Sequence, residues 1–241
     1  TPALMMGIML TTSVRKTFRL YLPSLGFLGV GLLLPFVLHP LSLELASSLD
    51  WFFPALPAGT VAVLKSMSDP NQPIWLILMA FAFAPAVCEE LAFRGFILSG
   101  FGRRGRAWLA IILSSVTFGA MHMIPQQVFN ATLLGLALGL MAVHSRSLFP
   151  GVIFHFIYNS LSVLRGRIPE TWVPENGLQH FVTMGPDGLR YSWPLLVISA
   201  VVAIVLLRWV VLQSNSRADQ KSTSVESLTS SAFDRRLTDT K

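Results

Sequence analysis

Long uncharged stretches recur along the chain, and their lengths predict helices that cross a membrane. Each stretch lacks Asp, Glu, Lys and Arg; the stretches are residues 20–43, 71–88, 107–145, 147–164 and 191–207. A helix needs about 20 apolar residues to cross the hydrocarbon core of a bilayer. Residues 107–145 are too many for one span, and the polar Pro125-Gln126-Gln127 divides them into two helices. The pattern therefore predicts an all-α fold, a polytopic transmembrane bundle of about six helices.

The order of these stretches divides the chain into four segments. Residues 1–72 hold the first span and an outer connection, and residues 73–165 hold the central spans. Residues 166–212 hold an outer loop and the last helix. Residues 213–241 are rich in Ser, Thr and charged residues, which predicts a disordered tail. The chain begins with Thr1 rather than Met, which favours a processed N-terminus or a place inside a longer polypeptide.

Composition agrees with a membrane protein and excludes several other classes. The chain is 53% hydrophobic and 12% charged, whereas about a quarter of the residues of soluble domains are charged. The net charge of +6 comes from short basic clusters, and no basic stripe alternates with exposed aromatic residues. Nucleic acid is therefore not an expected partner. The single cysteine, Cys88, excludes an intrachain disulfide and a multi-cysteine metal site.

The basic clusters also predict which side of the membrane is cytoplasmic. Residues 15–19, 103–106 and 146 carry Arg and Lys without an acid, and alternating spans bring them to one side. The connection 44–71, on the other side, carries three acids and one Lys. Because cytoplasmic loops are enriched in Lys and Arg, the C-terminus is expected in the cytoplasm. Two basic residues of the outer loop, Arg165 and Arg167, count against this orientation.

Three ionisable residues lie in one apolar stretch, where each costs roughly 2.5–3.5 kcal/mol at membrane depth. Glu90 and Arg94 are four residues apart, so they share a helix face and can pair. Glu89 points about 100° away around the helix and has no such partner on it, which leaves it available as an acid or base. The alternative is that Glu-Glu-Arg only marks the cytoplasmic end of a helix.

Further polar residues on two other predicted helices favour a catalytic site. They are His122, and the pair His155 and Asn159, which are four residues apart and face the same way. We count their depth from the turns between the predicted helices, at a rise of about 1.5 Å per residue. By this count, these groups and Glu89 can lie in one layer of the membrane. A carboxylate, two imidazoles and an amide can hydrolyse a peptide bond through a bound water. Glu89, His122 and His155 would also suit zinc, although the chain has no His-Glu-x-x-His motif.

Three motifs resemble those of the CPBP intramembrane proteases, also called CAAX proteases or the Abi family. Glu89-Glu90-Leu-Ala-Phe-Arg94 matches EExxxR, Phe118-Gly-Ala-Met-His122 matches FxxxH, and His155-Phe-Ile-Tyr-Asn159 matches HxxxN. The resemblance covers about residues 75–165. It implies that Glu89 activates water with His122, that His155 and Asn159 form the oxyanion hole, and that Glu90 and Arg94 support Glu89. Phe118 is a candidate substrate contact.

The resemblance implies an endopeptidase that cleaves a membrane-associated peptide, either a prenylated CAAX-type protein or a leader peptide, with zinc dependence left open. Residues 84–99 also resemble protease domains fused behind bacterial ABC-exporter permeases. This implies a bacterial inner membrane and an ABC transporter as partner. Two alternatives stay open: a non-catalytic bacteriocin-immunity or scaffold protein of the same fold, and a small transporter subunit with a proton relay of Glu89, His122 and His155.

Overall fold

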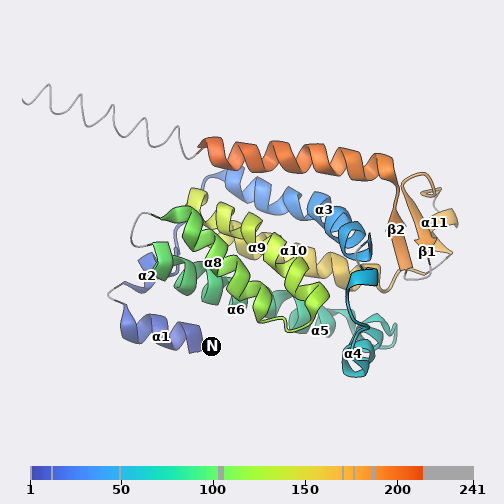
Figure 1. Cartoon of the computed structure of the whole chain (residues 1–241), viewed down its shortest axis with the longest axis horizontal. Coiled ribbons are helices and arrows are strands. Elements are labelled where there is room, and N and C mark those ends of the chain that lie inside the picture. Colours follow the sequence, from blue (N-terminus) through green and yellow to red (C-terminus); the bar gives the residue numbers. More distant parts are fainter. Residues whose placement is uncertain are drawn as a thin grey trace, which may run out of the picture.

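The computed structural model describes residues 2–11, 13–48, 50–102, 106–169, 171–175, 177–185 and 188–213. Residues 214–241 of the predicted tail and residues 103–105 of one basic cluster lie outside this part of the chain. Most described residues are helical, and the long helices lie alongside one another (Figure 1). The helices before the hairpin are α1 (Pro2–Leu10), α2 (Val14–Thr17), α3 (Leu25–Ser48), α4 (Ala58–Ser68), α5 (Ile74–Leu78), α6 (Ala84–Glu90), α7 (Leu98–Phe101), α8 (Ala107–Ala120), α9 (Pro125–Ser145), α10 (Phe149–Arg165) and α11 (Trp172–Glu175).

Helices α5, α6 and α7 form one continuous helix, Ile74–Phe101, joined by the wider π-helical turns Met79–Phe83 and Leu91–Ile97. Pro85 lies at the start of α6, directly after the first of these turns. Proline lacks the N–H that an α-helix needs, and such turns are frequent at functional sites. One π-helical turn precedes Glu89 and Glu90, and the other follows them directly.

Four described helices are long and apolar enough to cross a membrane: α3, Ile74–Phe101, α9 and Trp193–Gln213. Helices α8 and α10 are shorter, with 14 and 17 residues. Together these are the six long helices of the described chain. The prediction of an all-α transmembrane bundle is thereby confirmed, and the protein is an integral membrane protein.

The boundaries of the first two spans differ from the predicted ones. The first span begins at Leu25 rather than at residue 20, because Pro23 and Ser24 form the non-helical entry to α3. The second continues to Phe101, so Glu89 and Glu90 lie inside a 28-residue helix. The alternative that Glu-Glu-Arg marks only a helix end is wrong for this reason.

The sequence predicted His122 on a helix, but the residue lies in a turn. Helix α8 ends at Ala120, and the N–H of His122 donates to the carbonyl of Gly119 at 2.9 Å. Met123 then adopts a left-handed conformation with φ of 60°. This conformation turns the chain before α9 begins at Pro125.

Two connections between spans contain structure that the sequence did not predict. The connection after α3 holds a 3₁₀ turn, Asp50–Phe52, and helix α4. The predicted polar loop holds α11 and an antiparallel hairpin of β1 (Val182–Gly185) and β2 (Gly188–Tyr191). In Figure 1 the hairpin and α4 lie at the same end of the bundle.

Small residues let the helices that carry the candidate site approach closely. A Cβ added at Gly135 of α9 would lie 3.0 Å from Cα of Ser115 on α8, and one at Gly139 would lie 2.9 Å from Ile111. Gly135 and Gly139, four residues apart on α9, therefore pack against α8. Small residues at a helix interface allow this close approach within a membrane.

Candidate active site

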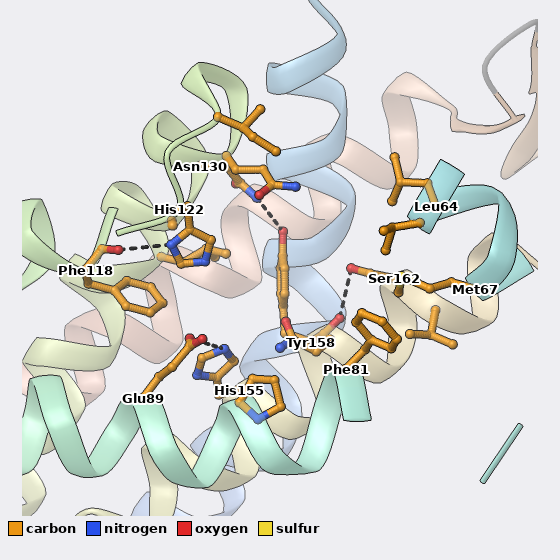
Figure 2. A pocket seen from close by; sticks show the side chains of 18 of the residues that line it. Leu64, Met67, Phe81, Glu89, Phe118, His122, Asn130, His155, Tyr158 and Ser162 are labelled. Carbon is orange, nitrogen blue, oxygen red and sulfur yellow. Dashed lines mark hydrogen bonds and ion pairs between the residues drawn. The ribbon is translucent and has the colours of Figure 1, made fainter. Parts of the chain in front are cut away.

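Five of the predicted site residues line one cavity of about 620 Å³, whereas Glu90 and Arg94 do not. Glu89 enters from the long helix Ile74–Phe101, Phe118 from α8, and His122 from the turn before α9 (Figure 2). His155 and Asn159 enter from α10. The structure therefore brings together residues from three parts of the chain, as their spacing predicted.

Glu90 lies at the centre of a buried chain of charged groups. Its Oε1 accepts a hydrogen bond from Nη1 of Arg94 at 2.7 Å, the pairing that the i,i+4 spacing predicts. The same oxygen lies 3.2 Å from Nδ1 of His155. At the other side of the imidazole, Nε2 lies 3.6 Å from Oε2 of Glu89. The order of contacts is Arg94, Glu90, His155, Glu89.

The two glutamates differ in their surroundings. The side chain of Glu89 is 33% exposed and lines the cavity, whereas that of Glu90 is fully buried. Helix α10 passes so close to Glu90 that a Cβ at Gly151 would lie 2.7 Å from its Oε2. Glu90 is therefore fixed by Arg94 and α10, and Glu89 is the carboxylate that a molecule in the cavity meets.

Phe118 holds several of these groups in place. Its ring lies under the guanidinium of Arg94, 4.2 Å from ring centroid to Cζ. The same ring contacts His122 and His155 edge-on, with centroids 4.9 and 5.8 Å apart. Only 4% of Phe118 is exposed, so its contacts orient Arg94 and both imidazoles. Its predicted role as a substrate contact stays a prediction.

The hydrogen bond of His122 assigns its ring nitrogens. Nδ1 lies 3.0 Å from the carbonyl oxygen of Phe118, which can only accept a hydrogen bond. Nδ1 of His122 therefore carries the proton, and Nε2 is the nitrogen with a lone pair. That nitrogen is able to accept a hydrogen bond from a water molecule in the cavity.

A second set of polar side chains lines the cavity and was missed in the sequence. Tyr158 accepts a hydrogen bond from Nδ2 of Asn130 at 3.2 Å and is paired with Ser42. Oγ of Ser162 lies 3.2 Å from Nε2 of His39. His39 belongs to α3 and is 2% exposed. A histidine inside an uncharged span is itself a signal of function or pairing. His39 therefore carries, in the sequence alone, a signal for this second set of polar side chains.

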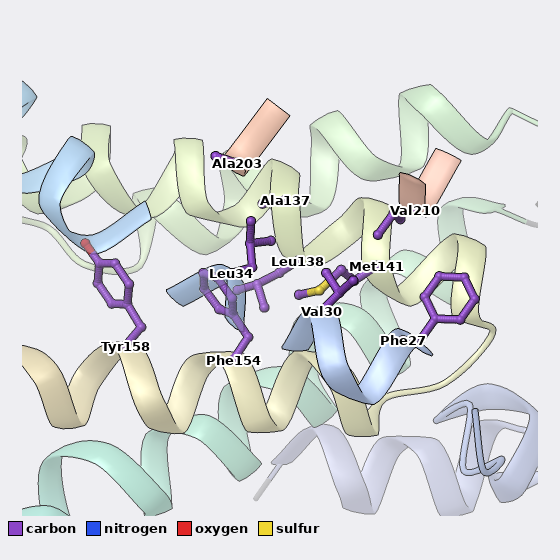
Figure 3. Packing of buried hydrophobic residues seen from close by; sticks show 10 residues of the cluster. All are labelled: Phe27, Val30, Leu34, Ala137, Leu138, Met141, Phe154, Tyr158, Ala203 and Val210. Carbon is purple, nitrogen blue, oxygen red and sulfur yellow. The ribbon is translucent and has the colours of Figure 1, made fainter. Parts of the chain in front are cut away.

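The floor of the cavity is part of the main apolar core. Leu138 and Phe154 line the cavity and also belong to a buried cluster with Phe27 and Leu34 of α3. Figure 3 shows these side chains between α3, α9 and α10. They are at most 1% exposed. The cavity is therefore closed on this side by close packing.

The three predicted zinc ligands do not form a ready metal site. Among the residues that the structure describes, no three His, Cys, Asp or Glu side chains are grouped so that they would hold a metal ion. In each imidazole Nδ1 is engaged, by the carbonyl of Phe118 at His122 and by Glu90 at His155, which leaves Nε2 as the free ring nitrogen. In this arrangement Glu89, His122 and His155 are not grouped as three zinc ligands, and the zinc dependence stays open.

A sequence model of the Rce1-like family, described as type II CAAX prenyl endopeptidases, matches residues 70–161. Residues 70–161 are an Rce1-like domain. The domain includes Ile74–Phe101, α8, α9 and most of α10. All six candidate catalytic residues lie within it, and so does Phe118. The resemblance inferred from the three motifs is thereby confirmed over residues 70–161, and this domain supports a membrane protease.

No curated protein and no solved structure matches the chain. The Rce1-like domain leaves α1–α4, the hairpin and the last helix outside the matched residues. Five residues of α4 nevertheless line the same cavity: Gly59, Thr60, Val63, Leu64 and Met67. The cavity is therefore built from the Rce1-like domain and from a helix that precedes it.

Proposed function

We propose that the protein is an intramembrane endopeptidase that hydrolyses a peptide bond of a membrane-associated substrate with a water molecule activated by Glu89. The supporting observation is that Glu89 lies 3.6 Å from His155 at a cavity that His122 and Asn159 also line. The substrate classes are those that the family implies, a prenylated CAAX-type protein or a leader peptide. An ABC transporter as partner stays a prediction.

Charge balance in the buried cluster supports a shared proton. Glu89 and Glu90 carry two negative charges and Arg94 carries one positive charge, so the cluster is neutral when the pair of Glu89 and His155 holds one additional proton. A buried group of charges is most stable when its charges are compensated. Because Glu90 accepts from Nδ1 of His155, the additional proton lies between Nε2 of His155 and Glu89.

Peptide hydrolysis follows from this arrangement. With the proton on His155, the Glu89 carboxylate takes a proton from water while the water oxygen bonds to the scissile carbonyl carbon. Nε2 of His155 and the amide of Asn159 donate hydrogen bonds to the oxyanion that forms. Glu89 then delivers its proton to the leaving nitrogen as the C–N bond breaks. His122 holds the water through its Nε2, and no step passes through a metal ion.

The purified protein in detergent or liposomes should cleave peptides, and a chelator should leave the cleavage intact because the proposed mechanism uses no metal ion. The assay uses a prenylated CAAX peptide and a library of unmodified apolar peptides, with mass spectrometry of the products. The matched variants are His155→Ala and Cys88→Ala, of which only the first should lose activity. Loss of cleavage with a chelator and recovery with zinc would overturn the metal-free mechanism, and no cleavage of any peptide would overturn the proposed function.

The orientation is part of the proposal, and contacts at both ends of the bundle support it. Nη1 of Arg19 donates to the carbonyl of Ala142, and the N–H of Leu148 donates to the carbonyl of Arg19. The basic segment before α3 therefore meets the α9–α10 turn, where Arg146 lies. At the opposite end, Arg190 of the hairpin pairs with Glu44 of α3 at 3.3 Å. The positive-inside rule assigns the first end to the cytoplasm and α4 to the outer side.

Cysteine labelling in bacterial spheroplasts checks this orientation. In a Cys88→Ala background, we expect an impermeant maleimide to label Ser66→Cys on α4 and not Ser13→Cys before α2. Both positions are exposed, so accessibility differs only through the membrane. In permeabilised cells, the maleimide should label both introduced cysteines. Labelling of Ser13→Cys alone in intact spheroplasts would reverse the assignment and place the cavity wall α4 in the cytoplasm.

A further inference from the structure

The cavity has a reactive end and an apolar end. Glu89, His122 and His155 lie at one end, and Leu64, Met67 and Phe81 lie at the other (Figure 2). Among the described lining residues there is no Lys or Arg, and Glu89 is the only acid. A ligand that reaches from Glu89 to the apolar end therefore presents an uncharged apolar group there, since a buried charge would lack a partner.

Helix α4 supplies most of the apolar end without being buried itself. None of its residues is buried, and Val63 and Leu64 are 46% and 42% exposed although they line the cavity. Covering such apolar side chains removes them from water or polar surroundings, at roughly 25 cal/mol per Å². An apolar group of a bound substrate would cover them and gain this energy.

Polar contacts hold the C-terminal end of α4 and the segment before this helix against neighbouring parts of the bundle. Nε2 of Gln126, at the start of α9, donates to the carbonyl of Pro54 at 2.7 Å. Nε of Arg167, beyond α10, donates to the carbonyl of Met67 at 2.9 Å. The position of α4 is thereby fixed relative to the two helices that flank the cavity. A wall held by such contacts can discriminate between side chains by size.

We propose that α4 is the specificity-determining wall of this protease: Leu64 and Met67 select a large apolar group next to the scissile bond. The inference rests on the proposed function and adds the substrate class. The catalytic residues lie within residues 70–161, whereas α4 lies outside them. The reaction chemistry is therefore that of the Rce1-like domain, and the choice of substrate is made by a separate segment of the chain.

The test compares Leu64→Trp with Ala62→Trp, which places the same indole side chain at an exposed α4 position outside the cavity. The peptides carry Ala, Leu, Phe or S-isoprenyl-Cys at each position flanking the cleaved bond. We expect Leu64→Trp to lower kcat/KM for Phe and isoprenyl peptides at least about tenfold relative to Ala peptides. Ala62→Trp should leave the ratio unchanged. The Leu, Phe and isoprenyl series distinguish an amino-acid side chain from a lipid as the apolar group.

Photo-crosslinking provides a readout that does not depend on turnover. A peptide with a photoreactive leucine should crosslink to residues 63–67 in the wild type, and much less in Leu64→Trp and Met67→Trp. An unchanged substrate ratio in Leu64→Trp, an equal change in Ala62→Trp, or crosslinks that avoid α4 would overturn the inference. Crosslinks to α4 without any cleavage would instead overturn the proposed function and leave the binding wall in place.

Discussion

Replacement of Glu89 by Gln should abolish peptide hydrolysis and leave the protein folded. Glutamine has nearly the same shape as glutamate but cannot take a proton from water. A general base contributes about 10²–10⁴-fold to the rate, so kcat should fall by at least about 10²-fold, with a smaller change in KM. Glu89 is 33% exposed and is not the partner of Arg94, so stability should change little.

Two neighbouring positions make this result specific. Cys88 precedes Glu89 on the same helix and does not line the cavity, so Cys88→Ser should retain activity. Glu89→Asp keeps the carboxylate but withdraws it by one methylene, so it should retain a small part of the activity. Product formation by mass spectrometry gives kcat, and thermal unfolding in detergent gives stability. A Glu89→Gln enzyme with more than a tenth of the wild-type kcat would exclude Glu89 as the base.

Local spacing was sufficient to predict part of the site. The i,i+4 rule pairs Glu90 with Arg94, and the structure has this contact at 2.7 Å. The same rule leaves Glu89 on another face, where it reaches the cavity. The helix periodicity that carries these predictions acts over a few residues, so neither depends on how the helices pack.

Contacts between distant segments could not be read from the sequence in the same way. The contact of His155 with Glu90 depends on the close passage of α10 at Gly151, which is a property of helix packing. Helix α4 was missed because its 11 residues are too few for a span, and polar and Pro-rich sequence surrounds it. His122 was placed on a helix because its neighbours are apolar, whereas the chain turns at Met123.

Replacement of Arg94 by Met should destabilise the protein strongly and also abolish activity. Arg94 and Glu90 are both fully buried, so removal of the guanidinium leaves the Glu90 carboxylate uncompensated. Breaking a buried ion pair in this way costs about 3–5 kcal/mol. Phe118 would also lose the cation over its ring. A large fall in the unfolding temperature in detergent is therefore expected.

The double variant Glu90→Gln with Arg94→Met separates stability from activity. It removes both charges, so it should recover much of the stability that Arg94→Met loses. Activity should not return, because a neutral amide in place of the Glu90 carboxylate holds the proton of His155 less strongly, and the orientation of His155 toward Glu89 would weaken. Unfolding temperatures and kcat of the wild type, both single variants and the double variant form a thermodynamic cycle. Recovery of wild-type kcat together with stability would show that the ion pair only supports the fold, and that Glu90 has no part in orienting His155.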